Sequence, residues 1–150
     1  MNAKDVYALV VVPDPHAHRD WYARHLGFTP AFDVDWCVYL VSPGNRRFGV
    51  CFMREGLHHQ LPQFRTAIRG DALVLTIEVE DAATALREIE ASGAVPEVSL
   101  RDEPWGQRHF MLRDPAGVWV DVVEQIEPDP GFLPEQARRQ LRAAADHTSG

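Results

Sequence analysis

The feature that most constrains the fold of this chain is an internal repeat. Val10–Pro30 reads as the end of an apolar strand, a turn, an amphipathic helix, a glycine and a new strand, and Ile77–Pro96 follows the same plan. The matching positions, 66 to 67 residues apart, are Asp14 and Asp81, Gly27 and Gly93, and Pro30 and Pro96. Three short apolar runs follow each helix, so the sequence predicts two tandem strand–helix–three-strand (βαβββ) modules.

Hydrophobic patterning and turn residues place the elements of both modules. In the first module we expect a helix at His16–Leu26 and strands at Val6–Val12, Thr29–Asp35, Trp36–Ser42 and Arg47–Met53. In the second we expect a helix at Ala82–Ser92 and strands at Leu73–Val79, Ala94–Leu100, Gln107–Arg113 and Val118–Gln125. The residues expected to begin and end the helices are the N-caps Asp14 and Asp81 and the left-handed glycines Gly27 and Gly93.

The length of 150 residues predicts a single domain. Its first module spans about residues 5–53, a linker without a clear period spans 54–70, the second module spans about 71–126, and a tail follows at 127–150. The tail carries one weak apolar stripe of helical spacing, made of Leu133, Ala137, Leu141 and Ala144.

Charge and hydropathy exclude two classes of partner. A net charge of −7 at pH 7 argues against a nucleic-acid-binding protein, which needs a basic face. The sequence lacks an apolar run of the ~18–20 residues that cross a bilayer, and residues 1–20 lack the apolar segment of a signal peptide. We therefore expect a cytoplasmic protein without a membrane partner.

The two cysteines, Cys37 and Cys51, fall in neighbouring predicted strands of the first module. A bridge between them is geometrically possible, but a reducing cytoplasm favours free, buried thiols. Their spacing is not that of a zinc motif.

Residues 5–126 resemble the vicinal oxygen chelate superfamily, which includes glyoxalase I, extradiol dioxygenases and bleomycin-resistance proteins. The most specific segment is Asp102–Gln125, DEPWGQRHFMLRDPAGVWVDVVEQ, which is similar to the final two strands of many members. The resemblance implies an α+β fold in which both modules curl into an eight-stranded, cup-shaped mixed sheet with the helices outside. It also implies a homodimer, because modules of this family usually associate in pairs.

Strand alternation sorts the side chains between the helix-packed face and the cup, because successive residues point to opposite sides. The residues expected under the helices are Ala8, Val10 and Val12, Phe48, Val50 and Phe52, Leu75, Ile77 and Val79, and Val118, Val120 and Val122. The neighbouring odd-numbered positions, and even-numbered Val74 and Thr76 in the fifth strand, are expected to face the cup.

Metal-dependent members of the superfamily present one His, Glu or Gln from each of four strands to a divalent ion. Carried over by position, these sites are Tyr7, Gly49 (or Cys51 in a shifted register), Val74 and Asp121. Asp121 alone coordinates well, and one carboxylate does not replace the three or four ligands that such ions need. We expect neither a metal nor another cofactor.

The histidines outside the cup do not supply a metal site either. His16, His18 and His25 lie on the outer helix, where we expect them to be solvated. His58 and His59 fall in the linker and are expected to be exposed, although this linker has the length to fold over a pocket. The remaining one, His147, belongs to the tail.

What remains in the cup is aromatic, sulfur-containing and lightly polar. The predicted ligand-binding residues are Tyr7, Leu9, Tyr39, Arg47, Cys51, Met53, Thr76, Trp105, His109, Met111, Trp119 and Asp121. Flat aromatic faces and adaptable methionines suit a large planar or conjugated ligand. The alternative is that the sheet packs tightly and these side chains only fill it, with Trp105 as a structural plug.

Two functions follow from this pattern. The first is a metal-independent binding protein of the resistance type, which sequesters an aromatic or hydrophobic natural product or antibiotic. The second is a metal-free isomerase, cyclase or hydrolase acting on a conjugated natural product, with His109 and Asp121 as an acid–base pair. The competing interpretation of Asp121 is a simple ion pair with Arg47 or Arg108.

Overall fold

The computed structural model describes residues 1–69 and 72–148, and the side chains of the last helix as far as Ala143. The first module contains β1 (Ala8–Val12), α1 (Pro15–Leu26), β2 (Thr29–Val34), β3 (Cys37–Val41) and β4 (Gly49–Arg54). The second contains β5 (Val74–Glu78), α2 (Ala82–Ala91), β6 (Val98–Glu103), β7 (Gln107–Arg113) and β8 (Trp119–Gln125). A short 3-10 turn, Pro62–Phe64, lies between the modules, and α3 (Glu135–Thr148) follows them.

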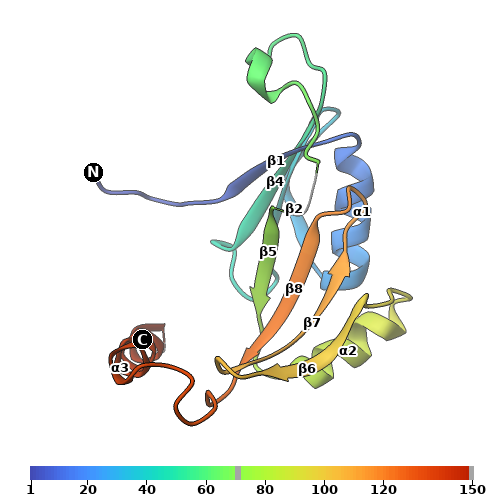
Figure 1. The fold of residues 1–150 in the computed structure, drawn as a ribbon. Helices are drawn as coiled ribbons and strands as arrows, with labels where there is room; N and C mark the ends of the chain where they lie inside the picture. The colour runs from blue at the N-terminus through green and yellow to red at the C-terminus, as the bar shows by residue number, and fades with distance from the viewer. Residues whose placement is uncertain (70–71, 149–150) are drawn as a thin grey trace.

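The predicted α+β fold is confirmed, with the strands divided between two four-stranded sheets of the same topology. The strand order is β1-β4-β3-β2 in one sheet and β5-β8-β7-β6 in the other. In each sheet the first and last strands of the module pair in parallel and the other neighbours are antiparallel. Figure 1 shows α1 and α2 on one side of the sheets, while the N-terminal segment and α3 project from the other side.

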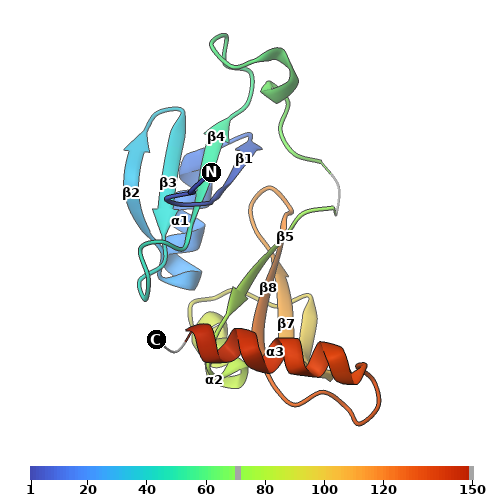
Figure 2. The ribbon, with the colours of Figure 1, turned by 90° about the vertical axis from the view of Figure 1, so that its left-hand side faces the viewer.

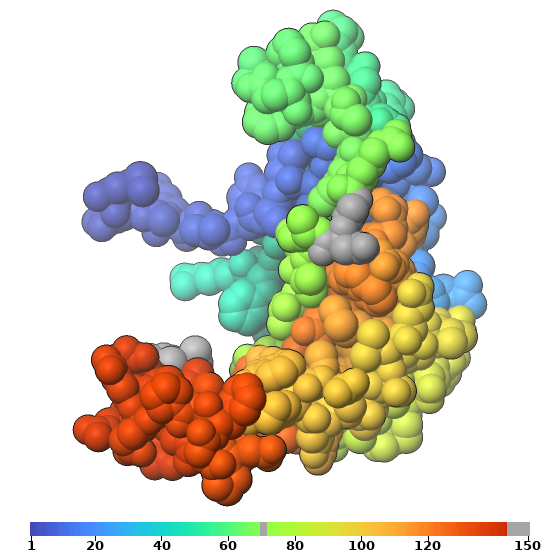
Figure 3. All heavy atoms as spheres, in the orientation of Figure 1, coloured from blue at the N-terminus to red at the C-terminus, as the bar shows by residue number. Residues whose placement is uncertain are grey.

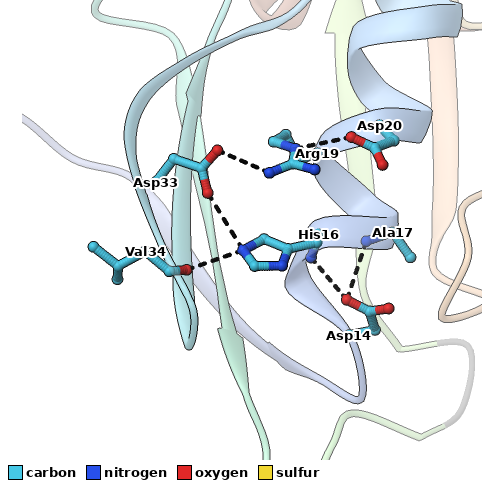
Figure 4. Close-up of polar contacts among 7 residues, drawn as sticks. All are labelled: Asp14, His16, Ala17, Arg19, Asp20, Asp33 and Val34. Carbon is cyan, nitrogen blue, oxygen red and sulfur yellow. Dashed lines mark hydrogen bonds and ion pairs between the residues drawn. The ribbon is translucent and has the colours of Figure 1, made fainter.

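Both helices begin at the expected N-caps and α1 ends at the expected glycine, whereas the C-cap of α2 is Ser92, one residue before the left-handed Gly93. The Asp14 carboxylate accepts hydrogen bonds from the backbone N–H groups of His16 (2.9 Å) and Ala17 (3.1 Å), as Figure 4 shows. Asp81 accepts one from Thr84 N–H at 2.8 Å, and this bond lowers the pKa of the Asp81 carboxyl. Gly27 takes the left-handed conformation after α1, with φ of 69°.

Polar contacts fix α1 against β2 (Figure 4). Arg19 donates to Asp20 at 2.8 Å and to Asp33 at 3.0 Å, and the bond from Arg19 lowers the pKa of the Asp20 carboxyl. His16 Nε2 lies 3.1 Å from the Val34 carbonyl oxygen and 3.4 Å from the Asp33 carboxylate. These groups are partly exposed, so the ion pairs orient the helix more than they stabilise the fold.

The two modules share one hydrophobic core between the sheets and helices. Val10 and Val12 of β1 are 3% and 0% exposed, and Val120 and Val122 of β8 are equally buried. Phe48 is a correction to the predicted core, because this side chain is 66% exposed. It belongs to the turn before β4, where its backbone N–H donates to the Asn45 carbonyl. Ala8, also predicted under the helices, is exposed.

A buried polar cluster joins α1 to the second module. The Tyr22 hydroxyl donates to the Asp114 carboxylate at 3.2 Å, and burial together with this carboxylate raises the pKa of Tyr22. His18 is 1% exposed; its Nδ1–H donates to the Asp14 carbonyl and its Nε2 lies 3.5 Å from Asp114. The expected solvation of His18 is therefore wrong, because its helix face packs against the core.

Of the other histidines, His25 is partly buried in a protein contact, whereas His58 and His59 are exposed to solvent. His25 is half-buried and its Nδ1 lies 2.6 Å from the Ser92 hydroxyl, with burial lowering its pKa. His58 and His59 are exposed as predicted, and the His59 ring packs edge-on against Trp36. The side chain of His147 lies outside the described residues.

Strand boundaries differ from the sequence expectation where the chain contains a turn or a proline. β6 begins at Val98 rather than Ala94, since Pro96 donates no ladder hydrogen bond and the register with β7 shifts between Val98 and Arg101. β1 begins at Ala8, so Tyr7 lies just before the strand. Within the described part of the chain, none of the helices is long and apolar enough to span a bilayer.

Candidate binding site

The side of the two sheets that faces away from α1 and α2 carries most of the predicted ligand-binding residues. We call it the open face and define it by Tyr7, Leu9, Tyr39, Cys51 and Met53 in the first module and Thr76, His109, Met111, Trp119 and Asp121 in the second. Strand pairing places the members of each set side by side: Leu9 and Tyr39 both pair with Cys51, and Thr76 and Met111 both pair with Asp121. Figure 3 shows this side hollowed between the N-terminal segment and α3.

In the first module the open face is aromatic. The Tyr7 and Tyr39 rings pack with centroids 5.0 Å apart, and Tyr7 and Leu9 remain 53% and 48% exposed. The Tyr39 ring lies over Gly49: a Cβ at this glycine would stand 2.6 Å from the Tyr39 hydroxyl oxygen. Glycine therefore lets the ring lie flat on the sheet, and partial burial raises the pKa of Tyr39.

The cysteines lie beside these rings as free, buried thiols, as predicted. Cys37 and Cys51 come from neighbouring strands, and their Sγ atoms are 3.3 Å apart. Burial, together with the hydrogen bond to Cys37, raises the pKa of the Cys51 thiol to about 12. The Cys51 thiol is therefore a weakly polar, buried group and not a nucleophile poised for reaction.

In the second module His109 lies between two carboxylates. Its Nδ1 is 2.8 Å from Asp121 Oδ1, and its Nε2 is 3.2 Å from Glu103 Oε1. Arg101 also contacts Glu103, with its Nε 2.7 Å from the same carboxylate oxygen. Carboxylates only accept hydrogen bonds, so the imidazole makes both bonds when both ring nitrogens carry a hydrogen. Both ring nitrogens thus face carboxylates, and 8% of His109 is exposed.

The expected proximity of His109 and Asp121 is thus confirmed, and the alternative pairing of Asp121 with arginine is wrong. Arg108 donates instead to Asp102, at 2.7 and 3.0 Å. Arg47 lies in the turn before β4 and not in the strand, so strand alternation does not assign its side chain to either face.

Glu103 was missed by sequence reasoning because the sixth strand was expected to end at Leu100. In the structure β6 continues to Glu103, and Arg101 pairs directly with His109. The signal was present in the Asp102–Glu103 dipeptide just before the Pro104 turn, where strand alternation puts one carboxylate on each face.

The two tryptophans of the second module differ in their surroundings. Trp119 is half-buried, and the Arg113 guanidinium carbon lies 3.7 Å from the centroid of its ring. Trp105 is 40% exposed, and its indole N–H donates to Gln107 Oε1 at 2.7 Å. The hydrogen bond orients the Trp105 ring without burying it, so this residue is a surface for contact and not a core plug.

A cavity at one end of the open face has a volume of about 590 Å³, within the range of small-molecule sites. Trp105 is the only predicted ligand-binding residue among those found to line it. Its further walls include Gln107 and Gln125 at the ends of β7 and β8, and Arg138 and Leu141 of α3. Sequence reasoning missed the contribution of α3, although the apolar stripe in the tail predicted the helix.

The four positions equivalent to metal ligands do not form a metal site. Val74 and Gly49 offer no side-chain donor, Tyr7 lies before β1, and Asp121 is bonded to His109. Among the described residues, no cluster of three or more His, Cys, Asp or Glu is arranged to hold a metal ion. The donor chemistry at these positions thus does not fit the divalent ion of the metal-dependent relatives.

The sequence also matches a known family. The model of the Glyoxalase/Bleomycin resistance protein/Dioxygenase superfamily matches residues 6–122. The chain belongs to this superfamily. No curated protein matches the sequence.

Solved structures support the superfamily fold. A glyoxalase/bleomycin resistance protein/dioxygenase from Nocardioides is 19% identical, with a TM-score of 0.70 over 89% of this chain and 91% of that one. A superfamily member from Sphaerobacter thermophilus is 24% identical, with a TM-score of 0.64 over 83% and 98% of the two chains. TioX from Micromonospora sp. ML1 is 22% identical, with a TM-score of 0.62 over 83% and 100%. At these identities the likeness shows the fold alone.

Proposed function

We propose that this superfamily member is a metal-independent binding protein, which sequesters an aromatic or hydrophobic natural product or antibiotic in the cytoplasm. The proposal is of the resistance type: a cell is protected when a toxic planar compound is held away from its target. Such a protein needs a contact surface and no reactive group.

The supporting observation is the contrast between the aromatic and polar parts of the open face. Tyr7, Leu9 and Trp105 remain about half exposed, so they are available to a ligand. In contrast, both ring nitrogens of His109 are bonded to carboxylates of the protein itself. Aromatic contact area is thus free, while the central polar group already has its partners.

Direct binding measurements test the proposal. Purified protein is titrated with a panel of planar antibiotics and aromatic natural products while tryptophan fluorescence is followed, because Trp105 and Trp119 both lie on or beside the open face. We expect saturable binding of at least one compound, and recovery of that compound with unchanged mass after long incubation. A panel without any saturable binding would contradict the proposal.

A second candidate, a metal-free isomerase, cyclase or hydrolase, is favoured by one observation: His109 contacts Asp121 at 2.8 Å and Glu103 at 3.2 Å. A histidine hydrogen-bonded to a carboxylate is a common arrangement for proton transfer. In this arrangement, however, both ring nitrogens already contact carboxylates, so neither is free to act as a base. Catalysis would require one of the two bonds to open when the substrate binds. A bound compound recovered as a rearranged or hydrolysed product would establish the enzyme.

We also propose that the protein forms a homodimer. β1 and β5 are edge strands of their sheets, and the N-terminal segment projects from the open side of the molecule (Figure 1). Exposed apolar side chains accompany this segment, including Val6 at 82% and Tyr7 at 53%. A second copy would cover this surface, since large exposed apolar patches mark interaction sites.

A further inference from the structure

The cavity at the end of the open face has one wall that belongs to neither module. Figure 2 shows α3 crossing in front of the second sheet, and the cavity lies between this helix and the ends of β7 and β8. The helix contributes Arg138, Leu141 and Arg142 to the lining. Two guanidinium groups one helical turn apart therefore face a space of about 590 Å³.

Arg138 is held in place by the protein with part of its hydrogen-bonding capacity unused. Its Nη2 donates to the Asp129 carbonyl oxygen at 2.8 Å, which fixes the plane of the guanidinium. Its Nε is buried, and among the described residues no group accepts a hydrogen bond from it. A buried donor without an acceptor is unfavourable, so an oxygen atom supplied from the cavity would satisfy it.

The opposite wall is aromatic. Trp105 presents a ring that is 40% exposed, and the bond from its indole N–H to Gln107 uses its polar atom. Phe132 lies beside it, with ring centroids 6.4 Å apart. Leu141 and Ile126 add apolar surface to the same cavity. A flat ring can thus lie against Trp105 while an attached group reaches Arg138.

We propose that α3 forms part of the ligand site, and that the cavity binds a planar aromatic molecule bearing an acidic group, a carboxylate or a sulfonate. The acid accepts hydrogen bonds from Arg138 and Arg142, and the ring system packs on Trp105. This inference rests on the proposed function and narrows its ligand to aromatic acids.

Two acidic residues, Glu78 and Glu127, also line the cavity, and their negative charges repel an acidic ligand. The Glu78 carboxylate accepts a hydrogen bond from Gln125 at 2.8 Å, which partly satisfies its charge within the sheet. Glu127 is exposed and belongs to the segment that leads from β8 toward α3. We expect the ligand's acid to lie at the arginine side, and removal of the Glu127 charge to tighten its binding.

A pair of dyes tests the charge preference directly. 1-Anilinonaphthalene-8-sulfonate and N-phenyl-1-naphthylamine share one aromatic skeleton, and only the first carries a sulfonate. Fluorescence titration of the full chain is expected to give at least tenfold tighter binding of the sulfonate. Arg138→Gln should remove most of this preference, roughly tenfold for a lost charge-assisted hydrogen bond, and should leave the neutral dye within about twofold. Glu127→Gln should strengthen binding of the sulfonate alone.

The matched control is Arg139→Gln, which removes the same charge from the same helix. Arg139 is exposed and pairs with Glu135 at 3.3 Å, away from the cavity lining. This variant should bind both dyes with the affinity of the native protein. Equal losses in Arg138→Gln and Arg139→Gln, or equal affinity of the two dyes for the native protein, would overturn this inference and leave the proposed function standing. Absence of saturable binding of either dye would count against both.

Discussion

His109 shows how the environment of one residue decides between two functions. An imidazole with one free nitrogen could accept a proton from a substrate, whereas the contacts of both nitrogens with Asp121 and Glu103 leave none free. The same carboxylates orient the ring and leave part of Asp121 directed to the open face, where it is half-buried. At the scale of single residues, these contacts hold the His109 ring in one orientation.

The first prediction separates binding from catalysis at Asp121. Asp121→Asn keeps the size of the side chain and one acceptor oxygen, so a binding protein should keep its ligand affinity within a few-fold. An enzyme that relies on the carboxylate would also bind, yet turnover would fall by about 10²–10⁴-fold. Ligand titration and product analysis of the same variant measure both. Asp102→Asn, on the same sheet but paired with Arg108, is the control.

The second prediction concerns aromatic contact at Trp119. A packed aromatic pair contributes roughly 0.5–1.5 kcal/mol beyond its buried area, and burial of the side chain contributes about 1.5–3 kcal/mol. For a ligand that extends from the cavity along the strands of the open face, Trp119→Ala should therefore weaken binding at least tenfold, with Tyr7→Ala close behind, while Trp119→Phe should retain most of the affinity. Calorimetric titration gives the values. Unchanged affinity in Trp119→Ala would place the ligand elsewhere.

At the scale of elements, the β3–β4 pair brings two thiols together on the buried part of the open face. Cys37 and Cys51 are not direct strand partners: Cys37 pairs with Met53, and Cys51 with Tyr39. The sulfur atoms nevertheless lie 3.3 Å apart, because both side chains point to the same face. Burial then raises the pKa of Cys51 to about 12.

The third prediction follows from this pKa. Burial disfavours the thiolate in the folded protein, so Cys51 should react with iodoacetamide far more slowly than a free thiol at pH 8, and normally once the chain is unfolded. The raised pKa stabilises the fold fully below the thiol's ordinary range, and this contribution is lost as pH rises from about 9 toward 12. Mass spectrometry of alkylated protein and urea unfolding at several pH values check both statements.

The elements also show where sequence reasoning reaches its limit. β7 matches its predicted bounds, Gln107–Arg113, because strict alternation and a following Asp-Pro-Ala-Gly turn fix its ends. β6 begins four residues later than predicted, because Pro96 donates no ladder hydrogen bond and because the register with β7 shifts between Val98 and Arg101. The alternation of apolar and polar residues reveals neither effect. The sequence predicted only part of the site, because the rest depends on tertiary packing. Strand parity located His109 and Asp121, whereas the role of Arg138 depends on where α3 packs.

At the scale of the whole molecule, the two modules pack together into one hydrophobic core on the helix side. On the open side each module presents its own exposed surface. Tyr22 and Asp114 bond across the module boundary, and α1 and α2 meet through Arg24 and Ser92. The open side has no such partner within the described chain: Val6, Tyr7 and Leu9 stay about half exposed or more. Because of this asymmetry, the open side is the surface that we propose for the ligand and for a second subunit.

The last prediction is therefore a homodimer that uses the N-terminal segment. Light scattering at micromolar concentration should give the mass of two chains. Val6→Asp places a charge on the projecting segment and should shift the population toward single chains. Val95→Asp is its matched control, because Val95 is 81% exposed against 82% for Val6 but lies on the helix side, between α2 and β6. A native mass of one chain would contradict the dimer, and dissociation by both variants alike would show that the N-terminal segment is not its interface.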